Sequence, residues 1–80
     1  MFEGFRIILA LKKLTSDAAH IPSSLVTETE YMVKKRFNTV EETAVTILRI
    51  SLDNKYITRD TLSPRAVELI AELEEYDEGN

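Results

Sequence analysis

Apolar residues recur every three or four positions in four stretches of this chain, and this spacing most constrains the fold because it lines one side of a helix. In residues 2–14 the apolar stripe is wide, of the kind that faces a core. Lys12 and Lys13 fall in the last turn, where cations complement the negative end of the helix dipole. A helix over residues 2–14 is therefore predicted, and its stripe comprises Phe5, Ile7, Ile8, Leu9, Leu11 and Leu14.

Two Thr–Glu pairs predict the next two helix starts. Thr27 precedes Glu30, and Thr39 precedes Glu42, by the spacing at which a hydroxyl and a carboxylate cap the free amides of a first turn. The pairs predict helices over residues 28–37 and 40–53, which end near Asn38 and Asn54 and follow a loop at 15–26. The expected inward residues are Tyr31, Met32, Val33 and Phe37 in the first helix, and Val40, Ala44, Val45, Ile47, Leu48 and Leu52 in the second.

The last third of the chain combines an extended piece with a final helix. Residues 55–58 alternate side chains and have β propensity. Ser63 and Pro64 then supply an N-cap and a proline at the first helical position, so a helix is predicted from Pro64 to about Tyr76. Its buried stripe is expected to be Ala66, Leu69, Ile70 and Leu73, with Glu68, Glu72 and Glu75 opposite.

Two phrases of the second half, Leu52-Asp53-Asn54-Lys55-Tyr56-Ile57 and Thr61-Leu62-Ser63-Pro64-Arg65-Ala66, resemble the back half of small winged-helix (helix-turn-helix) domains. The resemblance covers residues 44–73, and the front half agrees only in helix order. It implies a mainly α, four-helix winged-helix-like domain over residues 1–76 with a vestigial β element. The acidic tail at 77–80 is expected to fray because it has no apolar residue to anchor it. The sequence departs from the family where the wing is cut to the residues between Ile57 and Leu62, and where Ala66 replaces a common glycine.

The residue types favour no catalytic, cofactor or metal site. The chain has no cysteine and one histidine, His20, whereas nucleophilic catalysis and zinc binding each need several such groups at defined positions. Glu41-Glu42 and Glu74-Glu75 are typical of a helix start and of a solvated helix end. No apolar run approaches the ~20 residues of a membrane span. We expect a non-enzymatic, cytoplasmic protein without cofactors, of a size that suits a bacterial or phage accessory protein.

Basic residues carry the binding hypotheses. Residues 1–67 hold all ten Lys and Arg and eight of the fourteen acids, a net charge of +2, whereas residues 68–80 hold the other six acids. The leading hypothesis is a regulatory or adaptor protein that binds a partner protein through the surface of helices 28–37 and 40–53. The alternative is a winged-helix DNA-binding transcriptional regulator, although Glu41 and Glu42 would then face phosphates. The candidate contact residues are Lys34, Lys35, Arg36, Arg49 and Ile50.

The neighbourhood of Ile50 has two interpretations. It could join some of Tyr31, Met32 and Tyr56 in an exposed apolar patch, or those three residues could belong to the core. A homodimer that buries the helix at 40–53 is compatible with either binding hypothesis.

Overall fold

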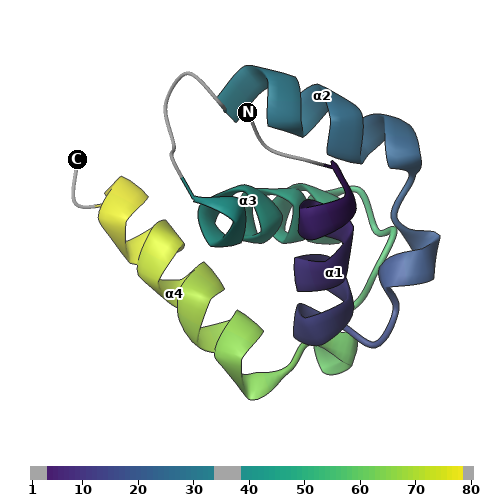
Figure 1. Ribbon diagram of the computed structural model, residues 1–80. Coiled ribbons are helices and arrows are strands. Elements are labelled where there is room, and N and C mark those ends of the chain that lie inside the picture. The colour runs from purple at the N-terminus through teal and green to yellow at the C-terminus, as the bar shows by residue number, and fades with distance from the viewer. Residues whose placement is uncertain (1–3, 34–38, 79–80) are drawn as a thin grey trace.

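Four α-helices, three of them packed on the fourth, make up most of the protein (Figure 1). The structure is a computed structural model, and it describes residues 4–33 and 39–78. A mainly α fold is confirmed, and the described residues contain no β-strand. The elements in chain order are α1 (Gly4–Leu14), the short 3-10 helix η1 (Ala18–His20), α2 (Ser23–Val33), α3 (Val40–Asp53), the short 3-10 helix η2 (Arg59–Thr61) and α4 (Pro64–Glu78).

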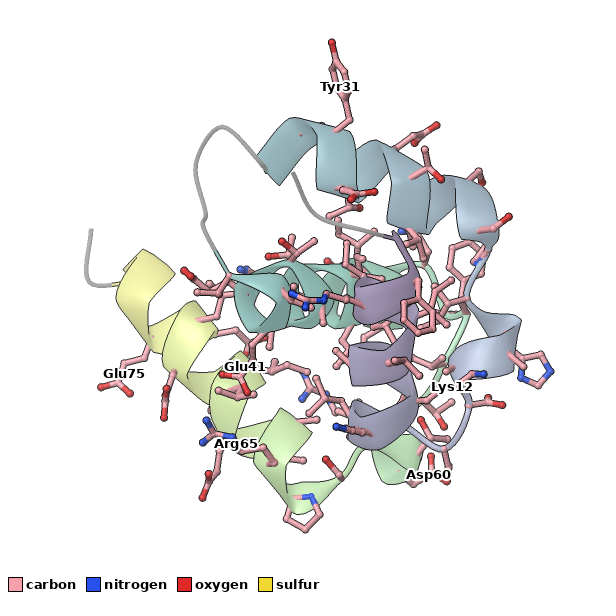
Figure 2. The ribbon with its side chains drawn as sticks, viewed as in Figure 1. Lys12, Tyr31, Glu41, Asp60, Arg65 and Glu75 are labelled. Carbon is pink, nitrogen blue, oxygen red and sulfur yellow. The ribbon has the colours of Figure 1, made fainter. Side chains whose placement is uncertain are left out.

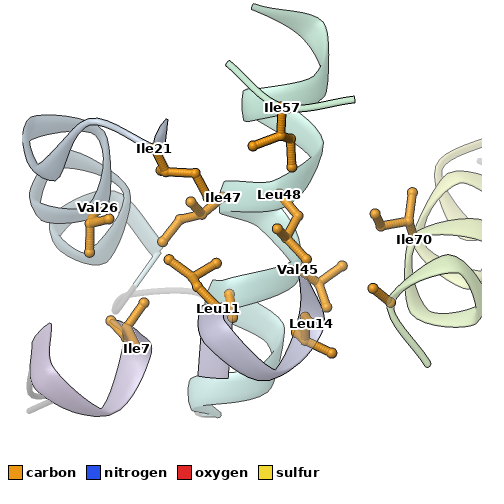
Figure 3. Packing of buried hydrophobic residues seen from close by; sticks show 12 residues of the cluster. Ile7, Leu11, Leu14, Ile21, Val26, Val45, Ile47, Leu48, Ile57 and Ile70 are labelled. Atoms are coloured by element: carbon orange, nitrogen blue, oxygen red, sulfur yellow. The ribbon is translucent and has the colours of Figure 1, made fainter. Parts of the chain in front are cut away.

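Helix α3 is the centre of the core because its sequence is apolar or small on most of its sides. Helices α1, α2 and α4 all contact it, and Figure 3 shows their side chains meeting around Ile47 and Leu48. Two buried hydroxyls on α3 are satisfied within the helix, since Ser51 Oγ donates to the Ile47 carbonyl at 2.7 Å and Thr43 Oγ1 donates to the Thr39 carbonyl at 3.2 Å. The central helix thus brings no unpaired hydroxyl into the core.

Both ends of α3 lie where the sequence predicts them. The Thr39 hydroxyl accepts the Glu42 amide at 3.1 Å and donates to the Glu42 carboxylate at 2.7 Å. At the other end Asn54 is the C-cap, and the next residue, Lys55, has a φ of 62°. The Lys55 amide donates to the Leu52 carbonyl at 3.1 Å and the Tyr56 amide donates to the Ser51 carbonyl at 2.9 Å. This pair of bonds is the Schellman arrangement that ends many helices.

Helix α2 begins at Ser23, so the predicted start at Glu28 is wrong. Thr27 lies inside the helix and its hydroxyl donates to the Ser23 carbonyl at 3.1 Å, so it is no N-cap. The Pro22 carbonyl instead accepts the amides of Leu25 and Val26, at 3.1 and 3.4 Å. Proline disfavours helical angles at the residue before it, and Ile21 is extended, with φ −82° and ψ 121°, so the helix cannot include Ile21. The earlier start also buries Val26 in the core.

Because α2 starts earlier than predicted, two residues that were predicted to lie in the core are exposed. Tyr31 and Met32 are 68% and 69% exposed, because Val26 and Thr29 form the face that packs inward. The prediction also used Phe37 and Asn38, which lie outside the described residues.

The predicted extended piece at 55–58 is wrong, since these residues form the turn after α3 that carries Ile57 into the core. The β contact lies elsewhere, as an isolated antiparallel bridge between Thr15 and Leu62. Here the Ser16 amide donates to the Thr61 carbonyl and the Ser63 amide donates to the Leu14 carbonyl, both at 2.9 Å. The Thr15 and Thr61 hydroxyls also bond at 2.9 Å. We call this junction between the end of α1 and the start of α4 the clasp.

Helix α4 begins at the predicted residue, and its buried and exposed sides are the predicted ones. The Ser63 hydroxyl accepts the Ala66 amide at 3.1 Å, and Pro64 is the first helical residue. The predicted stripe of Ala66, Leu69, Ile70 and Leu73 is buried or half-buried, and Glu68, Glu72 and Glu75 are exposed. The helix extends to Glu78, two residues past the predicted end, so the tail predicted to fray at 77–80 begins as helix.

Candidate functional site

The structure describes two of the five predicted contact residues. Lys34, Lys35 and Arg36 lie outside the described residues. Arg49 and Ile50 lie on α3 and are half-buried, in a narrow stripe that also contains Thr46. The stripe has Glu42 at one end and Asp53 at the other, both exposed. Helix α3 therefore offers a limited surface that is not basic overall.

The predicted patch around Ile50 does not include Tyr31 or Met32. Figure 1 shows α2 and α3 running in opposite directions, so Tyr31 and Met32 lie toward the start of α3 and Ile50 toward its end. Helix α3 has 14 residues and is therefore about 21 Å long, which separates its two ends. The alternative that Tyr31, Met32 and Tyr56 are core residues is also wrong, since Tyr56 is 42% exposed and Tyr31 projects outward from α2 (Figure 2).

The largest departure from the predicted surface is on α1. The wide apolar stripe predicted to face the core is divided, because Ile7, Leu11 and Leu14 are buried while Phe5, Ile8 and Leu9 are 66%, 41% and 43% exposed. The buried three follow the i, i+4, i+7 spacing of one helix side. Phe5 and Leu9 lie on the opposite side, and Ile8 lies at its edge. Helix α1 therefore has large apolar side chains on its buried side and also on its exposed side.

Three cations surround the exposed apolar residues of α1. Arg6, Lys12 and Lys13 are exposed, and α1 contains no acidic residue. Within residues 4–33 and 39–78 none of the three is in an ion pair, whereas Arg59 pairs with Glu74 at 3.7 Å. We call this surface the α1 face, and it consists of Phe5, Arg6, Ile8, Leu9, Lys12 and Lys13.

A cleft of 390 Å³ lies along one edge of the α1 face. Helix α1 supplies one wall and the first turn of α3 supplies the other; the lining residues are Arg6, Leu9, Ala10, Lys13, Leu14, Val40 and Glu41. The Glu41 carboxylate is paired with the Arg65 guanidinium of α4 at 3.5 Å, and Figure 2 shows these two side chains close together. The positive charges of Arg6 and Lys13 therefore dominate an otherwise apolar cleft.

Titratable groups elsewhere in the described chain do not form a chemical centre. His20 is bonded through Nδ1 to the Asp17 carboxylate, and its side chain is 70% exposed. No cluster of three or more His, Asp or Glu side chains that could hold a metal ion occurs among the described residues. The same residues include no helix with the length and apolar character needed to cross a bilayer.

The sequence contained a signal for the α1 face that the prediction did not use. A helix with apolar residues on nearly every side and three cations cannot bury all of its apolar residues in one core of this size.

Comparison of the chain with family models, curated proteins and solved structures gave no match.

Proposed function

We propose that this protein is a small, non-enzymatic adaptor or regulatory protein that binds a partner protein through the α1 face. The observation that supports this function is the exposure of Phe5, Ile8 and Leu9 on α1, among three cations that form no ion pair within residues 4–33 and 39–78. Large apolar side chains gathered on a surface and rimmed by charge are typical of protein–protein contacts.

Covering the apolar residues of the α1 face contributes favourable free energy to binding. Fully burying one large apolar side chain contributes about 1.5–3 kcal/mol. The three apolar residues are roughly half exposed, so a partner that covers them gains on the order of 2–4 kcal/mol from this source. The cations add to the rate and the selectivity of association more than to its strength.

The DNA-binding alternative has weaker support. In a winged-helix protein the helix that enters the major groove is the one corresponding to α3, which here is the central helix of the core. Its first turn carries Glu41 and Glu42, and Arg49 is its single cation. Bidentate contacts to guanine need arginine or lysine on the reading helix, and carboxylates at its leading end repel phosphates. The apolar side chains of the α1 face also have no role in binding phosphates.

The proposed function can be tested by comparing two charge substitutions at equally exposed apolar residues. Leu9 and Val67 are 43% and 48% exposed, the first on the α1 face and the second on α4. The wild-type chain, Leu9→Glu and Val67→Glu would be immobilised and incubated with lysate of the cells that produce the protein. We expect one partner protein to be retained by the wild type and by Val67→Glu and lost by Leu9→Glu.

Two results would contradict this function. The first is that no protein distinguishes Leu9→Glu from Val67→Glu while circular dichroism shows both variants folded. The second is binding of the wild type to a labelled DNA duplex in about 50 mM salt that collapses at about 200 mM, the behaviour expected of phosphate contacts. That second result would favour the nucleic-acid alternative.

A further inference from the structure

We propose that the α1 face recognises an acidic amphipathic helix of the partner protein. In this arrangement the partner's apolar side chains cover Leu9 and enter the cleft beside Ala10 and Val40, and its carboxylates lie against Arg6 and Lys13. This inference rests on the proposed function, because it specifies what kind of segment a protein partner presents.

The spacing of the two cations matches that of a neighbouring helix. Arg6 and Lys13 are seven residues apart, so they project from the same side of α1 about two turns, or roughly 10.5 Å, apart. A second helix that packs along α1 presents its own side chains at i and i+7 with the same separation. Leu9 lies between the two cations and provides an apolar contact at the middle of the pairing.

The form of the cleft also favours a helix. It lies between two helices, and its apolar lining comes from Leu9, Ala10, Leu14 and Val40. Amphipathic helices bind such grooves with apolar residues at i, i+3, i+4 and i+7. The described residues include no β-strand whose free edge could pair with an extended peptide.

The charge of the cleft selects an acidic segment. Among its described lining residues Glu41 carries the one carboxylate, and it is paired with Arg65. Arg6 and Lys13 have no carboxylate partner within the same described residues. A basic helix would place like charges against these two cations, and such repulsion excludes wrong partners. Nucleic acid would satisfy the cations but would leave the apolar lining of the cleft without a matching surface.

The experiment uses two synthetic peptides of about 15 residues, or about 22 Å of helix. Both have leucines at helical spacing, and the flanking positions are glutamate in one peptide and lysine in the other. Affinities are measured by fluorescence anisotropy with the full-length chain, and the contact surface is mapped from amide chemical shifts of the ¹⁵N-labelled chain. We expect the acidic peptide to bind with shifts concentrated on α1 and the first turn of α3, and the basic peptide to bind roughly tenfold more weakly.

Charge reversal provides the matched control. In the double variant Arg6→Glu, Lys13→Glu the peptide preference should invert, whereas Lys55→Glu, Arg59→Glu, which reverses two exposed cations outside the α1 face, should leave it unchanged. Equal affinity for the two peptides, shifts located elsewhere, or an unchanged preference after reversal at Arg6 and Lys13 would overturn the inference.

The two proposals fail in distinguishable ways. If the peptides show no acidic preference but lysate capture still depends on Leu9, the acidic-helix inference is wrong and the protein-binding function stands. If capture does not depend on Leu9 either, the proposed function is wrong as well. Stronger shifts on α1 with duplex DNA than with the acidic peptide would overturn the inference in favour of nucleic acid.

Discussion

Replacing Ile7 and Ile8 with alanine, one at a time, tests the orientation of α1 on which the binding proposals depend. The two residues are neighbours of the same type in the same helix, and they are 0% and 41% exposed. Both substitutions change intrinsic helix propensity equally, since isoleucine becomes alanine in each. Any difference in stability between the variants therefore reports the difference in burial.

The expected difference is large compared with the stability of a chain of this size. Truncating a buried isoleucine to alanine costs about 2–5 kcal/mol, from lost apolar transfer and from the cavity left behind. At Ile8 the loss of partial burial is partly offset by the better helix propensity of alanine, so we expect a loss of only about 1 kcal/mol. An 80-residue domain has a free energy of unfolding of roughly 4–12 kcal/mol. Ile7→Ala therefore removes a large share of it.

Urea unfolding followed by circular dichroism measures both free energies, provided that the m value stays constant among the variants. A loss of about 3 kcal/mol at Ile7 corresponds to a fall in Tm of roughly 12–24 °C. Leu11→Ala and Leu9→Ala form a second pair of this kind, at 2% and 43% exposure. If the two isoleucine variants differ by less than about 1 kcal/mol, α1 does not lie as described and the α1 face loses its basis.

Three further predictions concern local features. Thr39→Ala should lower the free energy of unfolding by about 1 kcal/mol and Thr27→Ala by less than about 0.5 kcal/mol, because only Thr39 caps a helix; urea titrations that rank Thr27 as the costlier site would contradict this. Lys55→Gly should raise Tm, because a φ of 62° costs a side-chain-bearing residue about 1–2 kcal/mol; a lower Tm in calorimetry would refute it. Arg65→Ala should cost less than about 1 kcal/mol, since its exposed ion pairs are 3.5 and 3.6 Å long; a cost that does not shrink in added salt would show another role.

The parts of the fold that the sequence predicted are those that depend on neighbouring residues. The N-cap at Thr39, the end of α3 at Asn54 and the start of α4 at Ser63-Pro64 each rest on hydrogen bonds within a few positions. The start of α2 shows how such a prediction fails. Thr27 has the spacing of an N-cap, but Pro22 begins the helix one turn earlier and buries Val26, so tertiary packing decides between two local signals.

The candidate site could not be predicted in the same way, because it depends on which side of α1 the rest of the chain covers. The periodicity identified the helix and its apolar residues correctly. It could not show that Ile7 and Leu11 are covered while Phe5 and Leu9 stay exposed, since the covering residues belong to α2 and α3. The pairing of Glu41 with Arg65, which leaves the cleft positive, is likewise a contact between distant segments.

The clasp has a consequence for folding kinetics. The bond between Thr15 and Thr61 joins positions 46 residues apart, and the entropy lost in closing a loop grows with its length. We expect α1 to dock on α3 before the clasp closes, because this docking leaves only the short segment after α3 to be closed. Contacts made after the folding transition state change the unfolding rate and leave the folding rate nearly unaltered. We therefore expect substitutions at Thr15 and Thr61 to change the lifetime of the closed junction between α1 and α4 without slowing folding.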